Sequence, residues 1–240
     1  MCTVSVVPYS GGFRVMSNRD ERRGRAVAMQ PSIDALGSRS AAMPIDPVGG
    51  GSWIGVNNAG VVAALLNRHD LRPMPIRTCA SRGLIVRLAL ACESVGAAAE
   101  SVRSLDCGRF RPFRLVLVQA HHIALLGGDA RGVAFAESTL DQPYMFTASS
   151  LGDVFVDAPR RRLFECLMHH VGDRLDAQRL FHRHQWANRR DVSVLMERDD
   201  AATVSRTTID IGERGIALEY ESLIPCRPVE KVEKLELSPC

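Results

Sequence analysis

Hydrophobic and polar residues alternate in two short runs at the start of the chain. Residues 2–7 and 13–18 both show the two-residue period of a half-buried strand. Between them, residues 8–12 read Pro-Tyr-Ser-Gly-Gly, a composition typical of a turn. The pattern predicts a β-hairpin, and antiparallel pairing through this turn places Cys2 opposite Arg19.

The register of this hairpin decides which polar side chain lies beside Cys2. A slip of one residue would bring Asn18 or Asp20 opposite Cys2 in place of Arg19. In either register, residues 18–21, which read Asn-Arg-Asp-Glu, lie next to the N-terminus.

A second hairpin is predicted over residues 52–67. The turn at residues 58–60 reads Asn-Ala-Gly, which supplies positions of positive φ. The strand that follows it, residues 61–67, is nearly all apolar, as expected of a strand buried on both faces. This apolar run ends abruptly at Asn67.

Residues 22–51 separate the two hairpins and show no regular pattern. They contain Pro31, Pro44, Pro47 and three consecutive glycines, which predicts a long surface loop. Loops of this length in compact domains are often lids or binding loops. Three arginines at its start could hold an anionic substrate group, although such residues are often simply solvated: Arg22, Arg23 and Arg25.

The remaining elements alternate between groups of strands and groups of helices. Helices are expected over residues 81–104, capped by Ser81 and broken at Gly96, and over residues 160–170, capped by Asp157. Strands are expected over residues 113–119, 123–127, 133–138, 144–148, 192–197, 203–211 and 216–222, followed by a charged tail at 226–240. This order favours an α+β fold in one domain, residues 1–240: a four-layer αββα sandwich of two mainly antiparallel sheets.

Composition excludes several functional classes. The net charge is only +3, and all but two of the 30 basic residues are Arg, which indicates a GC-rich genome more readily than nucleic-acid binding. Seven cysteines without a CxxC pair indicate neither a zinc site nor a disulfide framework, and favour a reducing compartment. No charged-then-apolar leader and no apolar run of spanning length are present, so a cytoplasmic protein without a membrane span is expected.

Cys2 has a chemical meaning that depends on its position. Removal of Met1 would leave a thiol and a free α-amine on one residue, and an α-amine with a pKa of about 7.7 to 8.0 can act as a general base. Cationic neighbours such as Arg19 lower a thiol pKa, so Cys2 is expected to be the most readily alkylated cysteine. The alternative is that Cys2 is a small buried hydrophobic residue in a strand.

The opening residues Met-Cys-Thr and the Asn-Arg-Asp-Glu motif at residues 18–21 resemble the NRDE family, also called the transport and Golgi organisation protein 2 family. The resemblance extends along nearly the whole chain. It implies the αββα fold of N-terminal-nucleophile hydrolases. For this family amide hydrolysis, haem trafficking and acyl-lipid handling have all been proposed.

The resemblance also implies roles for individual residues, by analogy with similar enzymes that hydrolyse penicillin V or conjugated bile salts. Cys2 is the expected nucleophile, Asp20 holds its amine, Arg19 lies nearby, Asn67 donates to the oxyanion, and Arg206 matches a late arginine. Ser150 stands where relatives carry an asparagine, and Ser17 stands where the related hydrolases carry an arginine. We also expect Asn18, Trp53 and Ser150 to contact the substrate.

Two functions remain open from the sequence. The first is an N-terminal-cysteine amidohydrolase that cleaves the amide bond of a small acylated amine. The second is a non-catalytic protein that binds or traffics haem or an acyl-CoA-type lipid in the same cleft. Histidines at the end of one helix and in the segment after it could ligate a metal or haem iron, but show no ligand motif, so neither a cofactor nor a metal site is expected: His169, His170, His182 and His184.

Overall fold

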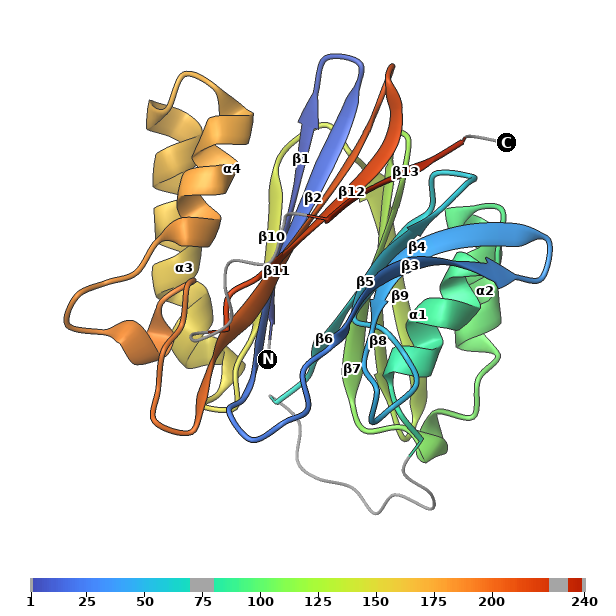
Figure 1. Ribbon diagram of the computed structural model, residues 1–240, viewed down its shortest axis with the longest axis horizontal. Coiled ribbons are helices and arrows are strands. Elements are labelled where there is room, and N and C mark those ends of the chain that lie inside the picture. Colours follow the sequence, from blue (N-terminus) through green and yellow to red (C-terminus); the bar gives the residue numbers. More distant parts are fainter. Residues whose placement is uncertain (1, 70–79, 225–232, 239–240) are drawn as a thin grey trace.

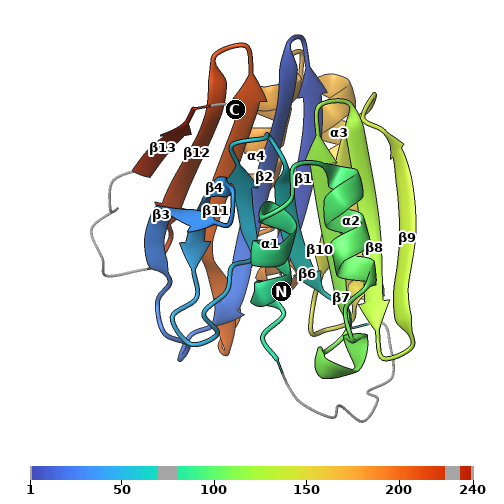
Figure 2. The same cartoon turned by 90° about the vertical axis from the view of Figure 1, so that its right-hand side faces the viewer.

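Two antiparallel sheets lie face to face, and each carries a pair of helices on its outer face (Figure 1). The computed structural model describes residues 2–69, 80–224 and 233–238. The four layers confirm the expected αββα sandwich. One sheet is covered by helices α3 (Asp153–His170) and α4 (Arg174–Arg183), and the other by helices α1 (Gly83–Leu90) and α2 (Val95–Arg103) (Figures 1 and 2).

The six-stranded sheet, called sheet A below, joins the two ends of the chain. Its strand order is β10-β1-β2-β11-β12-β13, so β1 is an inner strand with neighbours on both sides. The strands are β1 (Cys2–Tyr9), β2 (Gly12–Arg22), β10 (Tyr144–Ala148), β11 (Ala201–Gly212), β12 (Gly215–Ser222) and β13 (Glu233–Leu237).

The predicted register of the first hairpin is confirmed. Cys2 pairs with Arg19 on β2 and with Ala148 on β10. The tail expected at 226–240 is corrected in part, because Glu233–Leu237 pairs with β12 as an edge strand. Residues 225–232 and 239–240 lie outside the described residues.

The seven-stranded sheet, called sheet B, is a meander in which every strand pairs with its neighbours in sequence. Its strands are β3 (Met29–Leu36), β4 (Arg39–Ile45), β5 (Ile54–Asn57), β6 (Val62–Asn67), β7 (Phe113–Gln119), β8 (His122–Asp129) and β9 (Gly132–Thr139).

The expectation of a long loop over residues 22–51 is wrong, because β3 and β4 form a hairpin there. Pro31 is compatible with a strand because β3 is the edge of sheet B, where a missing ladder N–H is tolerated. On β4, Ala41, Ala42 and Met43 are fully buried, and these small apolar residues made a weak pattern that the flanking prolines obscured.

The helices begin at other residues than predicted. α1 (Gly83–Leu90) has no side-chain cap from Ser81, and the break before α2 (Val95–Arg103) is closed by Ser94, which accepts a hydrogen bond from the Ala97 N–H at 3.2 Å. Gly96 lies inside α2, so the expected break there is wrong.

α3 (Asp153–His170) begins before the predicted Asp157 cap and includes Pro159, while α4 (Arg174–Arg183) follows after a short turn. Burial of Val156 and Phe164 against sheet A outweighs the backbone hydrogen bond that Pro159 cannot make.

The strand predicted over residues 192–197 does not form. A 3₁₀ turn (Arg190–Val192) occupies its start, and only Glu197 makes an isolated bridge. The carbonyls that would have paired with a neighbouring strand instead accept side-chain donors: Arg160 donates to Val192 O and Ser193 O.

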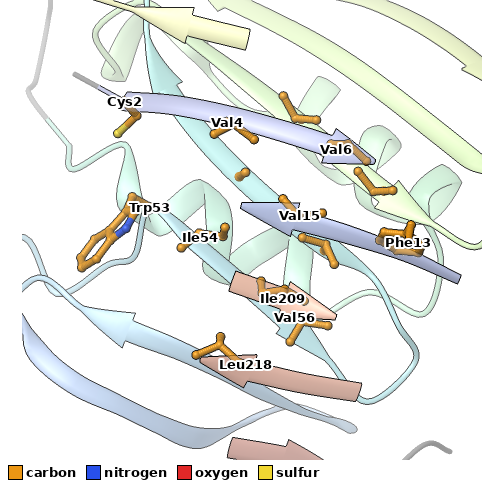
Figure 3. Packing of buried hydrophobic residues seen from close by; sticks show 14 of the residues in the cluster. Cys2, Val4, Val6, Phe13, Val15, Trp53, Ile54, Val56, Ile209 and Leu218 are labelled. Atoms are coloured by element: carbon orange, nitrogen blue, oxygen red, sulfur yellow. The ribbon is translucent and has the colours of Figure 1, made fainter. Parts of the chain in front are cut away.

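The main core lies between the two sheets. Val4, Val6 and Val15 from sheet A meet Ile54 and Val56 from sheet B (Figure 3). A second core packs α1 and α2 on the outer face of sheet B, and a smaller third core lies between sheet A and α3 and α4. The site described below lies at one end of the main core.

Candidate active site

Cys2 lies on the face of sheet A that meets sheet B. Its side chain shares this face with Val4 and Val6 and is 7% exposed (Figure 3). Because β1 is held by β2 and β10, two ladders fix the position of the cysteine. The thiol is therefore anchored at the rim of the inter-sheet core.

Arg19 lies directly opposite Cys2 and shares its face, since paired residues in antiparallel strands point to the same side. Its guanidinium carbon lies 4.1 Å from the centre of the Trp53 ring, a cation–π contact. Its guanidinium lies 3.4 Å from the carboxylate of Glu21. Trp53 in turn packs against Tyr220, with ring centres 6.5 Å apart. Arg19 thus brings a positive charge beside the cysteine, and Trp53 adds an aromatic surface under that charge.

Burial dominates the electrostatics of Cys2. It raises the pKa of the thiol, and the nearby positive charge of Arg19 opposes that rise only in part. The expectation of an activated, easily alkylated thiol is therefore corrected. The thiol is protonated at neutral pH, so any nucleophilic attack needs a base to remove its proton.

Asp20 points to the other face of sheet A, toward α3, because neighbours on a strand alternate and β2 continues as far as Arg22. Its carboxylate is buried and accepts a hydrogen bond from the Thr203 hydroxyl at 2.7 Å. Burial raises the pKa of Asp20, and the positive charge of Arg160 opposes this rise. Arg19 and Asp20 thus flank the start of β1 from its two faces.

A β-bulge in β11 lies next to both residues. The register shifts between Thr203, which pairs with Asp20, and Ser205, which pairs with Arg19. Because Val204 is the extra residue of the bulge, Thr203 and Ser205, which would share a face in a regular strand, pair with residues on opposite faces of sheet A.

A layer of buried polar side chains joins sheet A to α3 and α4. Arg160 is 1% exposed and donates hydrogen bonds to the hydroxyls of Thr3 at 2.8 Å and Thr147 at 2.6 Å. His182 contacts Ser5 Oγ through Nε2 at 2.7 Å and Asn18 Oδ1 through Nδ1 at 3.0 Å. No sequence pattern indicated this layer, because arginine and histidine on helices are ordinarily exposed.

Asn18 belongs to this layer, so the expectation that it contacts substrate is not supported. Its amide donates to His182 O at 2.9 Å and Val194 O at 3.0 Å, and the side chain is fully buried on the face away from Cys2. Arg206 pairs with Asn18 in the ladder and therefore shares that face, where it forms an ion pair with Glu221. The structure does not bring either residue to the cysteine.

Two further predicted residues also lie apart from the thiol. Asn67 pairs with Phe113, whose ring packs in the core beneath α1 and α2, so the register places Asn67 on the outer face of sheet B. Ser150 follows β10, is exposed, and accepts a hydrogen bond from Arg198 at 3.3 Å. Neither side chain is aimed at Cys2.

A cavity of about 250 Å³ opens beside Arg19, at the end of the inter-sheet space. Its charged lining consists of Arg19, Glu21, Arg22, Arg23 and Arg25.

Most of the remaining wall is apolar, including Ala28, Val204 and Ile224, and Thr203 and Tyr220 also line it. The three arginines that the sequence suggested for an anionic group therefore do surround one cavity together with Arg19.

The family is decided by the sequence itself. The family model described as Transport and Golgi organisation 2 matches residues 4–190. The chain belongs to this family. No curated protein sequence matches the chain significantly.

Solved structures similar to this Transport and Golgi organisation 2 family member are N-terminal-nucleophile hydrolases, which confirms the fold. A mutant of the conjugated bile acid hydrolase from Clostridium perfringens aligns with a TM-score of 0.58 at 10% identity, covering 98% of this chain and 92% of that one. The Caenorhabditis elegans orthologue of N-acylethanolamine-hydrolyzing acid amidase gives 0.60 at 12% identity, covering 87% and 92%. Penicillin V acylase from Agrobacterium tumefaciens gives 0.53 at 14% identity, covering 93% and 83%.

The histidines of this family member do not form a metal site in the part of the chain that the structure describes. His182 is fully buried, and burial lowers its pKa to about 3, so it is neutral at physiological pH. His169 and His170 contact each other edge to face at the end of α3. Among the described helices, none is long and apolar enough to span a membrane.

Proposed function

We propose that this protein is an amidohydrolase that uses Cys2, after removal of Met1, to cleave the amide C–N bond of a small acylated amine. The observation that carries the proposal is the position of Cys2: the thiol lies at the start of an inner strand, opposite Arg19, which itself lines the arginine-rich cavity. The similar solved structures are named as hydrolases of a bile acid conjugate and of N-acylethanolamines, both of which are amides.

In the proposed reaction, the α-amine of Cys2 takes the proton of Sγ, and the sulfur forms a bond to the amide carbonyl carbon. The tetrahedral intermediate collapses with cleavage of the C–N bond, and the departing amine takes up the proton. Water then attacks the acyl thioester, releases the carboxylic acid and returns the proton to Sγ. Because burial raises the pKa of the thiol, a base on the same residue is the feature this site needs.

The neighbouring residues support these steps from two sides. Arg19 shares the face of Cys2 and supplies positive charge where negative charge develops on the carbonyl oxygen. Asp20 lies one ladder position beyond Arg19, at the level where the Cys2 amine would emerge, and we propose that it orients this amine. Arg160 keeps a compensating positive charge near that carboxylate.

The test uses protein with an uncleavable residue placed ahead of Cys2, which converts the amine into an amide without basicity. General-base help is typically worth about a hundred- to ten-thousandfold, so turnover of an acyl-amide library should be lost while the fold is kept. The control is Cys2→Ser with a free terminus, which keeps the amine and nearly the same volume and should retain a trace of activity. Intact mass first establishes that Met1 has been removed.

Turnover that persists undiminished in the extended protein would refute the N-terminal-nucleophile mechanism.

One observation favours a second function, a non-catalytic binding protein for haem or an acyl-CoA-type lipid. The predicted oxyanion donor Asn67 and Ser150 are not aimed at the thiol, and Cys2 itself is buried. In this case no turnover appears in the unmodified protein, and neither extension nor Cys2→Ser changes ligand affinity beyond a steric effect. Both functions are proposed for the cytoplasm, where free thiols persist.

A further inference from the structure

The cavity beside Arg19 has a charge balance that defines its ligand. Four guanidinium groups and one carboxylate line it. Two of the arginines have further acidic partners outside the lining, since Arg25 pairs with Asp46 at 2.5 Å and Arg23 lies 3.8 Å from Glu197. Glu197 also pairs with Arg190 at 3.0 Å, so these acids do not neutralise the four arginines, and the cavity keeps an excess of positive charge that favours an anionic group.

The unmatched charge lies with Arg19 and Arg22. Arg22 is exposed, and no side-chain hydrogen bond or ion pair of its guanidinium is recorded among the described residues. Arg19 shares Glu21 with Arg25, at the loose distances of 3.4 and 3.6 Å. Close charge-assisted contacts are nearer 2.7–2.9 Å, so Arg19 retains capacity for a second acceptor.

Two buried polar groups lie next to Arg19. The indole N–H of Trp53 and the hydroxyl of Ser205 are buried and have no hydrogen-bond partner in the described structure. Trp53 lies under the Arg19 guanidinium, and Ser205 is the ladder partner of Arg19. Buried donors are ordinarily satisfied, so these two groups leave unused hydrogen-bonding capacity beside Arg19, although neither residue lines the cavity itself.

The size and lining of the cavity restrict the ligand further. At about 250 Å³ it lies below the range of about 300–1,000 Å³ typical of drug-sized ligands, so it holds a small group. The apolar wall formed by Ala28, Val204 and Ile224 suits a short aliphatic side chain. An acid with a small apolar substituent fits both the charge and the wall.

We infer that this cavity receives the carboxylate and side chain of a small apolar amino acid, and that the substrate is therefore an N-acyl amino acid. The substrate assignment rests on the proposed amidohydrolase function, whereas the acid-binding role of the cavity does not. In such a substrate only the amide nitrogen and one carbon separate the scissile carbonyl from the carboxylate. Because Cys2 and Arg19 are direct ladder partners, with Cβ atoms about 4.5–5.5 Å apart in such pairs, one molecule reaches both.

The test compares two probes that differ in one group, N-hexanoylalanine and its carboxamide, by calorimetric binding to the Met1-processed protein. A charge-assisted hydrogen bond is worth about 1.5–3 kcal/mol, so the acid should bind roughly ten- to a hundredfold more tightly than the carboxamide. Raising the salt concentration should reduce this preference, since Arg22 is exposed.

The matched variants are Arg22→Gln and, as a control, Arg162→Gln, an exposed arginine on α3 that does not line the cavity. Arg22→Gln should reduce the preference for the acid by up to about fivefold, while Arg162→Gln leaves it unchanged. Equal binding of the two probes, or no binding of either, would overturn the inference. If the acid is preferred but never hydrolysed, the proposed amidohydrolase fails while the assignment of the cavity stands.

Discussion

Replacing Arg160 by methionine should be among the most destabilising single changes in this protein. Methionine keeps much of the aliphatic length but removes a guanidinium that is 1% exposed and donates to Val192 O at 3.0 Å and Ser193 O at 2.6 Å. The hydroxyls of Thr3 and Thr147, which are 3.2 Å apart, can still bond to each other. The two carbonyls lose this donor.

The magnitude follows from these contacts. A buried polar group left unsatisfied costs about 1–3 kcal/mol, and two carbonyls lose their partner. The buried Asp20 also loses the positive charge that opposes the rise of its pKa. At about 1–3 kcal/mol for each carbonyl, we expect a loss of about 2–6 kcal/mol out of a total stability of about 5–15 kcal/mol.

The free energy of unfolding is measured by urea denaturation for purified Arg160→Met and for the control variant Arg161→Met. Arg161 is the next residue on α3, and its ion pair with Asp157 is exposed, so its loss should cost no more than about 0.5 kcal/mol. The slope of the transition should be unchanged, because the same surface unfolds. A loss below about 1 kcal/mol for Arg160→Met, or equal losses for the two variants, would refute the view that this arginine holds α3 to sheet A.

Three further predictions concern chemistry and packing. Brief treatment with iodoacetamide at neutral pH should modify the exposed Cys166 faster than Cys2, because burial raises the pKa of the Cys2 thiol. Peptide mass mapping compares the two rates, and faster labelling of Cys2 would show an activated thiol. Burial also raises the pKa of Asp20, so the folded state holds that proton more tightly than the unfolded chain, and this contribution to stability is lost as pH rises above the unfolded value of 3.8. In thermal melts, the stability of Asp20→Asn relative to the unmodified protein should therefore increase as pH rises through that window. An increase toward acid pH instead would contradict this sign. Gly128→Ala should cost about 1–3 kcal/mol by denaturation because the new methyl group meets the Phe113 ring, while Gly172→Ala, which has open space, should cost far less; similar losses would exclude this clash as the cause.

Local patterns were sufficient for the first hairpin and for the order of the layers. The alternation of residues 2–7 and 13–18 around a glycine turn predicts a hairpin with Cys2 opposite Arg19, with a slip of one residue left open, and the structure has the unslipped register. Because β2 continues to Arg22, strand alternation places Arg19 and Asp20 on opposite faces. Short-range geometry was thus read correctly.

The rest depended on contacts between residues far apart in the sequence. The partners of the Asn18 amide lie 164 and 176 residues away, so the assignment of Asn18 to a buried layer rather than to substrate was not readable locally. Arg160 stands in a run of three arginines that resembles a solvated helix face. The segment around Val194 has the alternation of a strand, but side-chain donors occupy the carbonyls that a neighbouring strand would have used.

The strand order of sheet A has a consequence for biosynthesis. Sheet B is a continuous meander from β3 to β9 and can form as the chain emerges, whereas β1 and β2 must wait for β10 and β11 to be translated. Closure of such distant strand pairs is also intrinsically slow. The face that carries Cys2 is therefore completed late, after most of the chain has been made. For the proposed nucleophile, this delay leaves time for the enzymes that remove Met1 to act before residue 2 is enclosed between the sheets.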